Sequence, residues 1–229
     1  MICSQQNLED KKYLRLGMKA SSEHHYLTIS EGGKGEYREK GSKFFGQAFP
    51  VRTGNDIREY LESVQAEHPK SRHVCYAWKL GTDGMRFRAN DDGEPSGSAG
   101  KPILGRIESF EITDTLITVA RYFGGTKLGV PGLINAYRTA AEEALKKSSI
   151  KELEVPAFLK VEAGFDEISQ VEQLVRQTSA EVLDRHYSEQ VGYSIRMGRS
   201  QRELSESFLT ERINLGSNLQ FEWLDNPEI

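Results

Sequence analysis

The spacing of hydrophobic residues predicts that short strands and amphipathic helices alternate along the chain. In the first 150 residues, runs rich in β-branched and aromatic residues end at glycine, proline or aspartate, which is typical of strands. The predicted strands lie at 25–30, 42–51, 73–81, 85–90 and 113–123. The last of them, TDTLITVARYF, is almost continuously apolar and is expected to be buried on both faces. The charged, glycine-rich segment 31–41 is predicted to be a loop.

Three further segments carry their apolar residues on one helical face and are predicted to be helices: 53–69, the end of 91–110, and 133–149. Thr53 or Asn55 can cap the first of these helices, and Ser98 can cap the second. Both central helices follow a strand and a glycine-rich loop. This strand–loop–helix arrangement therefore occurs twice in the first part of the chain.

The last third of the chain has a compact, regular rhythm. Asp166 is the expected cap of its first helix. The predicted elements are strands at 157–165, 180–188, 190–198 and 218–224, and helices at 166–178 and 200–214. Their order, β-α-β-β-α-β, is typical of a ferredoxin-like domain.

Charge divides the chain at about the same place as the pattern of elements. Through Ile150 there are 22 Lys and Arg against 19 Asp and Glu, a net charge of +3. From Lys151 onward there are 8 against 15, a net charge of −7. Charges and a proline also interrupt the hydrophobic pattern in 148–158. We therefore predict an α+β protein with a flexible extension at 1–24, a first domain at 25–150, a linker at 151–154 and a second domain at 155–229.

The composition favours a soluble cytoplasmic protein. No apolar run approaches the roughly 18 residues that span a bilayer. The N-terminus lacks the order of a secretory signal, and Met18 could serve as a second start. The only cysteines are Cys3 and Cys75, which argues against a disulfide framework, and Cys75 is expected to be a small buried residue. No cofactor motif is present, and the pattern does not specify an oligomeric state.

The two glycine-rich loops are the candidate functional face. A loop that opens a helix exposes backbone N–H groups at the positive end of the helix dipole, which suits an anion. The second loop has neither the spacing of a P-loop nor that of a dinucleotide fingerprint. The alternative is that the glycines only supply positive φ angles and close packing. The candidate binding residues are Ser98, Gly100, Lys101, Arg106, Arg121, Gly124, Gly125, Lys127, Gly129 and Gly132.

The segment NDDGEP adds carboxylates to the first loop. Asp91, Asp92 and Glu94 are weak candidates for a hard cation, because the EF-hand spacing is absent. A turn whose carboxylates bind neighbouring backbone, or pair with Arg121, is the favoured interpretation. His73, with Asp92 or Glu94, is the candidate acid–base pair if the fold brings them together. The remaining histidines have no metal-ligand spacing.

Three segments carry a resemblance to a known family. SRHVCYAW, DDGEPSGSAGKPIL and RYFGGTKLGVPGLINAYR, in this order, are similar to the YigZ/IMPACT family over about 43–145. The resemblance implies a first domain like domain 2 of ribosomal protein S5 and a ferredoxin-like second domain. Eukaryotic members of the family regulate translation as binding proteins, so the resemblance implies a link to translation. It carries no settled enzymatic activity.

Three functions follow as hypotheses. The favoured one is a protein that binds RNA, the ribosome or a ribosome-associated regulator, with Arg121, Lys127, Lys101 and Arg106 meeting phosphate. The second is an enzyme for a small phosphorylated or acylated substrate, with His73 and a carboxylate transferring protons. The third is an adaptor whose acidic second domain docks a basic protein partner. No membrane partner is expected.

Overall fold

The structure is a computed structural model that describes residues 23–224. The described residues form two compact units: Tyr26–Leu153 belongs to the first, and the second contains Glu23–His25 and 154–224. The predicted extension at 1–24 lies almost wholly outside the described residues. Within 23–224, no helix has the length and apolar character needed to cross a membrane.

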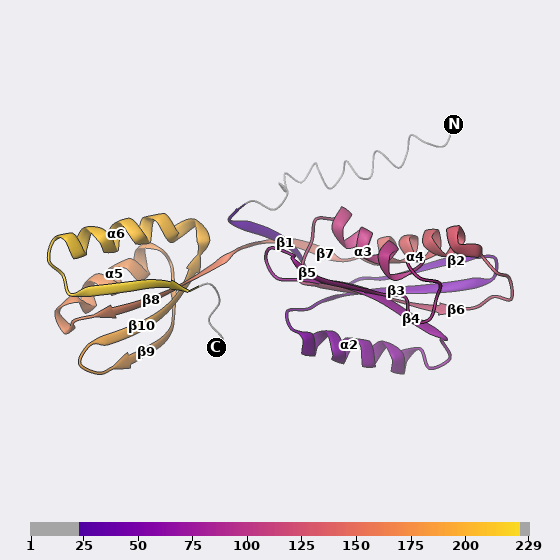
Figure 1. Ribbon diagram of the computed structural model, residues 1–229, viewed down its shortest axis with the longest axis horizontal. Helices are drawn as coiled ribbons and strands as arrows, with labels where there is room; N and C mark the ends of the chain where they lie inside the picture. Colours follow the sequence, from indigo (N-terminus) through magenta and orange to yellow (C-terminus); the bar gives the residue numbers. More distant parts are fainter. Residues whose placement is uncertain (1–22, 225–229) are drawn as a thin grey trace, which may run out of the picture. The chain divides into compact units, whose positions relative to one another are not determined.

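The first unit is built around a five-stranded antiparallel sheet with the order β2-β3-β6-β4-β5. Helix α2 covers one face of this sheet, and helices α3 and α4 cover the other (Figure 1). The strands are β2 (Lys34–Glu39), β3 (Ser42–Pro50), β4 (His73–Leu80), β5 (Arg86–Asn90) and β6 (Thr115–Tyr122). The helices are α2 (Gly54–Glu67), α3 (Gly100–Ser109) and α4 (Gly129–Lys146). A separate two-stranded sheet pairs β1 (His25–Glu31) with β7 (Ser149–Glu154).

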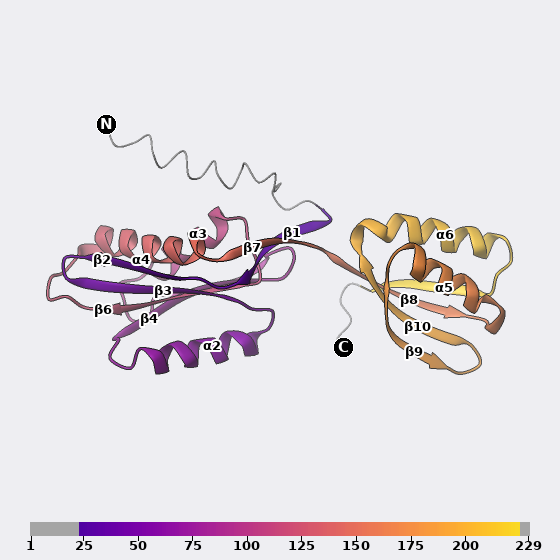
Figure 2. The same cartoon turned by 180° about the vertical axis from the view of Figure 1, so that it is seen from behind.

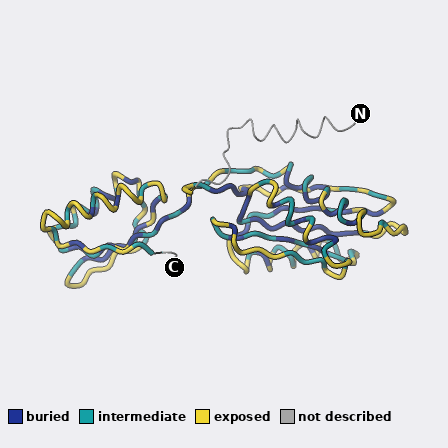
Figure 3. Tube along the Cα trace, turned by 45° about the horizontal axis from the view of Figure 1, so that its top comes forward, coloured by how far each residue is buried: buried dark blue, intermediate teal, exposed yellow. Residues whose placement is uncertain are grey.

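Strand β6 is the buried centre of the first unit. It lies between β3 and β4, and every residue from Thr115 to Arg121 is buried. The middle of the first unit is accordingly coloured dark blue in Figure 3. The main apolar core fills the space between the sheet and helices α3 and α4. A smaller cluster around Val51, Ile57 and Leu116 lies under α2. The expectation that 113–123 is buried on both faces is thus confirmed for 115–121, whereas Tyr122 is partly buried and Phe123 is exposed.

The second unit has the predicted βαββαβ order, with the sheet order β11-β8-β10-β9 and antiparallel neighbours. Both helices lie on one side of this sheet (Figure 2). A single core, which includes Leu159, Val171, Tyr193 and Leu209, fills the layer between them. The α+β prediction is therefore confirmed. The elements are β8 (Pro156–Ala163), α5 (Ile168–Gln177), β9 (Glu181–Tyr187), β10 (Val191–Gly198), α6 (Arg202–Asn214) and β11 (Leu219–Leu224).

Two segments predicted as irregular are strands. Within 31–41, Lys34–Glu39 forms edge strand β2, and Lys40 and Gly41 turn into β3 with positive φ at both positions. The apolar pattern of β2 is weak because one of its inward positions is Gly35. A side chain does not fit there, since a Cβ would come within 2.5 Å of the Ala144 backbone nitrogen on α4. The predicted linker 151–154 is the end of β7, whose charged residues lie on a two-stranded sheet.

The predicted helix caps had mixed outcomes. Asp166 does not cap a helix: it lies inside a 3-10 turn, Phe165–Glu167, and α5 begins only at Ile168. Thr53 does cap α2. Its Oγ1 accepts the Asp56 N–H at 3.1 Å, and the Asp56 carboxylate accepts the Thr53 N–H at 3.0 Å. This reciprocal pair is a capping box.

Replacing Thr53 by alanine should lower the free energy of unfolding by about 1 kcal/mol, because the Asp56 N–H loses its side-chain acceptor. Urea denaturation followed by circular dichroism measures this loss. Thr53→Ser keeps the acceptor oxygen and should remain close to the unsubstituted protein. Equal losses in the two variants would show that the hydroxyl does not stabilise the helix.

Candidate functional site

The two glycine-rich loops meet at one end of the first sheet because of its strand register. His73, the first residue of β4, lies opposite Arg121 near the end of β6, and Lys43 of β3 lies opposite Tyr122. Both neighbours run antiparallel to β6, so both begin where β6 ends. The loop at 91–99 enters α3 and the loop at 123–128 enters α4 at this same end.

The Asp91 carboxylate organises the first loop. It accepts the backbone N–H groups of Gly97 at 2.8 Å, Ala99 at 2.9 Å and Gly100 at 2.8 Å. Partial burial opposes ionisation, but these three donors and the nearby Lys101 outweigh it and lower the pKa of Asp91. Asp91 thereby takes the role predicted for Ser98.

Ser98 itself does not cap α3. The N-cap is Ala99, and the buried Ser98 Oγ has no hydrogen-bond partner among the described residues. The physical reason is the Asp91 carboxylate, which accepts the Ala99 and Gly100 N–H groups at the start of the helix in place of the hydroxyl.

His73 binds the backbone of the first loop, not a carboxylate. Its Nδ1 lies 2.6 Å from the Asp92 carbonyl oxygen, while the Asp92 carboxylate accepts the Val74 N–H at 2.6 Å. A carbonyl oxygen only accepts hydrogen bonds, so Nδ1 carries the hydrogen and Nε2 of the neutral ring is an acceptor. The structure therefore brings His73 beside Asp92 without forming the predicted carboxylate–histidine pair.

Glu94 and Arg121 form a buried ion pair. Arg121 Nη1 donates to Glu94 Oε1 at 2.6 Å, and the Tyr137 hydroxyl donates to the same oxygen at 2.8 Å. The two charged side chains are only 9% and 5% exposed. The guanidinium also lies over the rings of Phe44 and Phe123. The pairing of a first-loop carboxylate with Arg121, which the sequence predicted, is thus confirmed. Arg121 is held inside the fold by it and is not an exposed phosphate contact.

Cys75 and Tyr137 lie beneath this pair. Burial raises the pKa of the Cys75 thiol to about 12, and burial also raises the pKa of Tyr137. The Cys75 side chain is fully buried and donates to the Asp91 carbonyl oxygen at 3.0 Å. The expectation of a small buried residue is confirmed, and the thiol is not a nucleophile at neutral pH.

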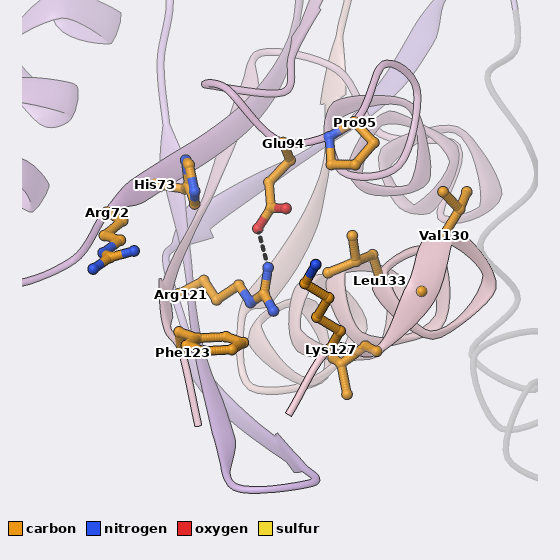
Figure 4. A pocket seen from close by; sticks show the side chains of 11 residues that line it. Arg72, His73, Glu94, Pro95, Arg121, Phe123, Lys127, Val130 and Leu133 are labelled. Carbon is orange, nitrogen blue, oxygen red and sulfur yellow. Dashed lines mark hydrogen bonds and ion pairs between the residues drawn. The ribbon is translucent and has the colours of Figure 1, made fainter. Parts of the chain in front are cut away.

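A cavity of about 490 Å³ opens between the two loops (Figure 4). Arg121 lies at its centre, between Glu94 and Phe123. Two exposed cations also line the cavity: Arg72, just before β4, and Lys127, in the second loop. The lining residues are Arg72, His73, Glu94, Pro95, Arg121, Phe123, Lys127, Leu128, Gly129, Val130 and Leu133.

Several predicted site residues do not line this cavity. Arg106 instead pairs with Glu142 of α4 at 3.5 Å, and Lys101 is exposed in the first turn of α3. Gly124 has a packing role, because a Cβ there would come within 1.9 Å of the Gly41 carbonyl carbon. The other predicted residues outside the lining are Asp91, Asp92, Ser98, Gly100, Gly125 and Gly132.

The carboxylates of the first loop are committed to protein partners. Those of Asp91 and Asp92 accept backbone N–H groups, and that of Glu94 binds Arg121. Within residues 23–224, no group of three or more His, Cys, Asp and Glu side chains could hold a metal ion.

Six lining residues were not predicted from the sequence: Arg72, Pro95, Phe123, Leu128, Val130 and Leu133. Among them, Arg72 brings a charge and Phe123 an exposed ring. Phe123 is 51% exposed although it directly follows a buried strand. The sequence does hold a signal for this exposure: Phe123 directly precedes two glycines, which indicates that the strand ends there and that the ring lies outside it. Arg72 offered no signal, because exposed arginines are common next to strands.

The comparisons with known proteins bear on the segment that holds this cavity. The Impact N-terminal domain matches residues 40–145. The chain is 30% identical over 197 residues to the IMPACT family member YvyE of Bacillus subtilis, covering 86% of this chain and 91% of that protein. It is 33% identical over 177 residues to an IMPACT family member of Haemophilus influenzae, covering 76% and 85%. A crystal structure of a hypothetical protein superposes with a TM-score of 0.70 at 25% identity, covering 91% of this chain and all of that one.

Proposed function

Since this chain belongs to the IMPACT family, we propose that it is a translation-associated protein that binds single-stranded RNA at the cavity between its two glycine-rich loops. The link to translation comes from the family resemblance. The choice of RNA comes from the chemistry of the cavity.

The charge of the cavity is the observation that carries this proposal. Arg72 and Lys127 are exposed cations on its lining, and Glu94, the one carboxylate that the described residues contribute to it, is neutralised by Arg121. The cavity also contains the first turn of α4, where backbone N–H groups have no intrahelical acceptor. The site is therefore net positive and favours a phosphate.

Apolar walls distinguish this cavity from a simple anion site. Pro95, Phe123, Val130 and Leu133 contribute carbon surface beside the cations. Arg121 lies over the ring of Phe123, but the ring is still 51% exposed and its exposed side can stack on a nucleobase, since every nucleobase has a π face. Phosphate-binding cations beside an exposed aromatic ring are the combination that binds single strands without reading their sequence.

Reversing the two exposed cations should remove most RNA binding. We expect Arg72→Glu/Lys127→Glu to weaken binding of a fluorescent single-stranded RNA at least tenfold at low salt. Affinity for single strands falls with salt by a log–log slope of about 0.7 per phosphate neutralised, so the slope should shrink by about 1.4. Fluorescence anisotropy across a salt series measures both quantities, and co-sedimentation with ribosomes extends the test to the cell's own RNA.

The matched control is Arg58→Glu/Arg88→Glu, which makes the same charge change at exposed positions outside the cavity on the same unit. Arg121 is left intact, because a glutamate there would place a second carboxylate against Glu94 and unfold the site. Equal losses in the two double variants, or no binding by the unsubstituted protein at any salt concentration, would refute the proposal.

The position of His73 supports a second candidate function, an enzyme for a small phosphorylated substrate. His73 lines the same cavity as Arg121 and Lys127, and the Asp92 carbonyl oxygen holds its Nδ1 so that Nε2 is free to accept a proton. His73→Gln would then abolish turnover of a phosphate ester while RNA binding persists. If the unsubstituted protein turns over no such ester, this candidate is excluded.

A further inference from the structure

A second cavity lies on the opposite side of the same strand end. Arg121 and Tyr122 are neighbours in β6, so their side chains point to opposite faces of the sheet, Arg121 toward α4 and Tyr122 toward α2. The second cavity measures about 360 Å³. It is lined by Gly41, Lys43, Phe45, His68, Tyr122 and Phe123. Phe123 therefore lines both cavities.

Aromatic packing fixes the position of the rings in this second cavity. Phe45 stacks on His68 with ring centroids 5.4 Å apart. Tyr122 meets Phe45 edge to face at 5.6 Å and His68 at 5.8 Å. These three rings come from β3, β6 and the C-terminal cap of α2. The Tyr122 hydroxyl is thus held against His68 by packing as well as by polar contact.

A chain of hydrogen bonds determines which nitrogen of His68 carries the hydrogen. Gln47 Nε2 lies 2.9 Å from Glu67 Oε2, and a carboxylate only accepts, so the amide nitrogen of Gln47 faces this side. The same Nε2 lies 3.5 Å from His68 Nε2. His68 Nε2 is therefore the acceptor and Nδ1 carries the hydrogen. Burial lowers the pKa of His68, which keeps the ring neutral at pH 7.

As a result of these hydrogen bonds, the Tyr122 hydroxyl is a donor toward the cavity. His68 Nδ1 lies 3.1 Å from the Tyr122 hydroxyl oxygen and donates to it, so the hydroxyl's own hydrogen is free for another acceptor. Lys43, which lines the same cavity, also only donates. The second cavity thus presents two donors and an aromatic wall to a group rich in acceptor oxygens.

We propose that this second cavity is a nucleotide subsite, which holds the nucleotide next to the one in the first cavity. Tyr122 and Lys43 donate hydrogen bonds to the oxygens of this second nucleotide. Phe123 lies between the two nucleotides. The inference rests on the proposed RNA-binding function and extends it. A single strand that passes over Phe123 meets cations on both sides of the ring: Arg72 and Lys127 on one side, and Lys43 on the other. A flexible single strand can follow the end of β6 from one face of the sheet to the other, whereas a duplex is stiff over such short distances, so we expect the site to prefer single strands.

The test compares a ligand that fills one subsite with a ligand that fills both. The probes are uridine 5′-monophosphate and a labelled uridine tetranucleotide, each titrated against the full-length chain. Tyr122→Phe removes one hydroxyl and should weaken tetranucleotide binding about three- to tenfold, the range for one hydrogen bond. Binding of the monophosphate, which needs only the first cavity, should stay unchanged.

Two variants at His68 test whether the hydrogen bond from His68 Nδ1 makes the Tyr122 hydroxyl a donor to the nucleotide. An asparagine side chain places its amide nitrogen where Nδ1 lies, so His68→Asn should keep tetranucleotide affinity near that of the unsubstituted protein. A glutamine side chain reaches the Nε2 position, so His68→Gln should reproduce the loss seen with Tyr122→Phe. Thermal unfolding of each variant establishes that the fold is kept.

The possible outcomes separate this inference from the proposed function. If Arg72→Glu/Lys127→Glu weakens the tetranucleotide but Tyr122→Phe does not, the second subsite is refuted and RNA binding at the first cavity stands. Equal weakening of both probes by Tyr122→Phe also refutes the second subsite. If the unsubstituted protein does not bind the tetranucleotide, both proposals are overturned.

Discussion

Replacing Arg121 by methionine should lower the free energy of unfolding of the first unit by about 3–5 kcal/mol. The change leaves the Glu94 carboxylate, only 5% exposed, without its opposite charge. Tyr137 remains as a single donor to that carboxylate, which does not balance the cost of burying it. Urea denaturation followed by tryptophan fluorescence measures the loss.

The double variant Glu94→Leu/Arg121→Met separates burial of a lone charge from loss of packing. It removes both charges and keeps apolar volume, so it should recover most of the stability that the single variant loses. A double variant as unstable as Arg121→Met would contradict this explanation. In that case Arg121 would stabilise the unit chiefly through its contacts with Phe44 and Phe123.

Replacing Asp91 by alanine should cost about 2 kcal/mol or more, because the Ala99 and Gly100 N–H groups at the buried start of α3 lose their acceptor. The first loop should also lose its shape, since the Gly97 N–H is released at the same time. Urea denaturation measures the stability. Hydrogen exchange at Gly97, Ala99 and Gly100 measures the loop and should accelerate at all three amides.

The contribution of Asp91 should depend on pH in a defined direction. Its pKa is lowered in the folded state, so its stabilising effect is complete above the unfolded value of about 3.9 and is lost as the pH falls through the folded value. The stability difference between the unsubstituted protein and Asp91→Asn should therefore be constant from pH 7 to pH 5 and shrink below pH 4. A difference that stays constant down to pH 3 would mean that the ionised form is not what stabilises the loop.

Most elements could be predicted because their hydrophobic period is strong. Strand β6 reads as a continuous apolar run, and α4 has a clear apolar stripe, so both were found from local pattern alone. Edge strand β2 was missed because an edge strand buries few side chains and therefore has little apolar signal. The cap of α3 was misassigned to Ser98 because Asp91, seven residues earlier in the chain, reaches the helix only after the loop folds.

The sequence predicted which segments form the candidate site but not how their side chains are arranged in it. The segments NDDGEP and RYFGG were recognised, and they do meet at one cavity with His73. Arg121 was expected both to pair with a carboxylate of the first loop and to meet phosphate. It does pair with Glu94, and this pair and two aromatic rings hold it in the interior, where it is not an exposed phosphate contact. The exposed cations of the cavity are Lys127, which was predicted, and Arg72, which was not.

By itself, the sequence determined the α+β class, the βαββαβ order of the second unit and the two loops that open α3 and α4. These features follow from periodicity and turn residues, which act over a few positions of the chain. Only the tertiary structure decided that Arg121 is buried, that the Asp92 carbonyl oxygen orients His73, and that His68 and Tyr122 form a second cavity beside Phe123. Each of these depends on residues far apart in the chain, such as His68 and Tyr122, which the strand register and the position of α2 bring together. Such contacts determine whether a side chain points inward to a partner or outward to a ligand.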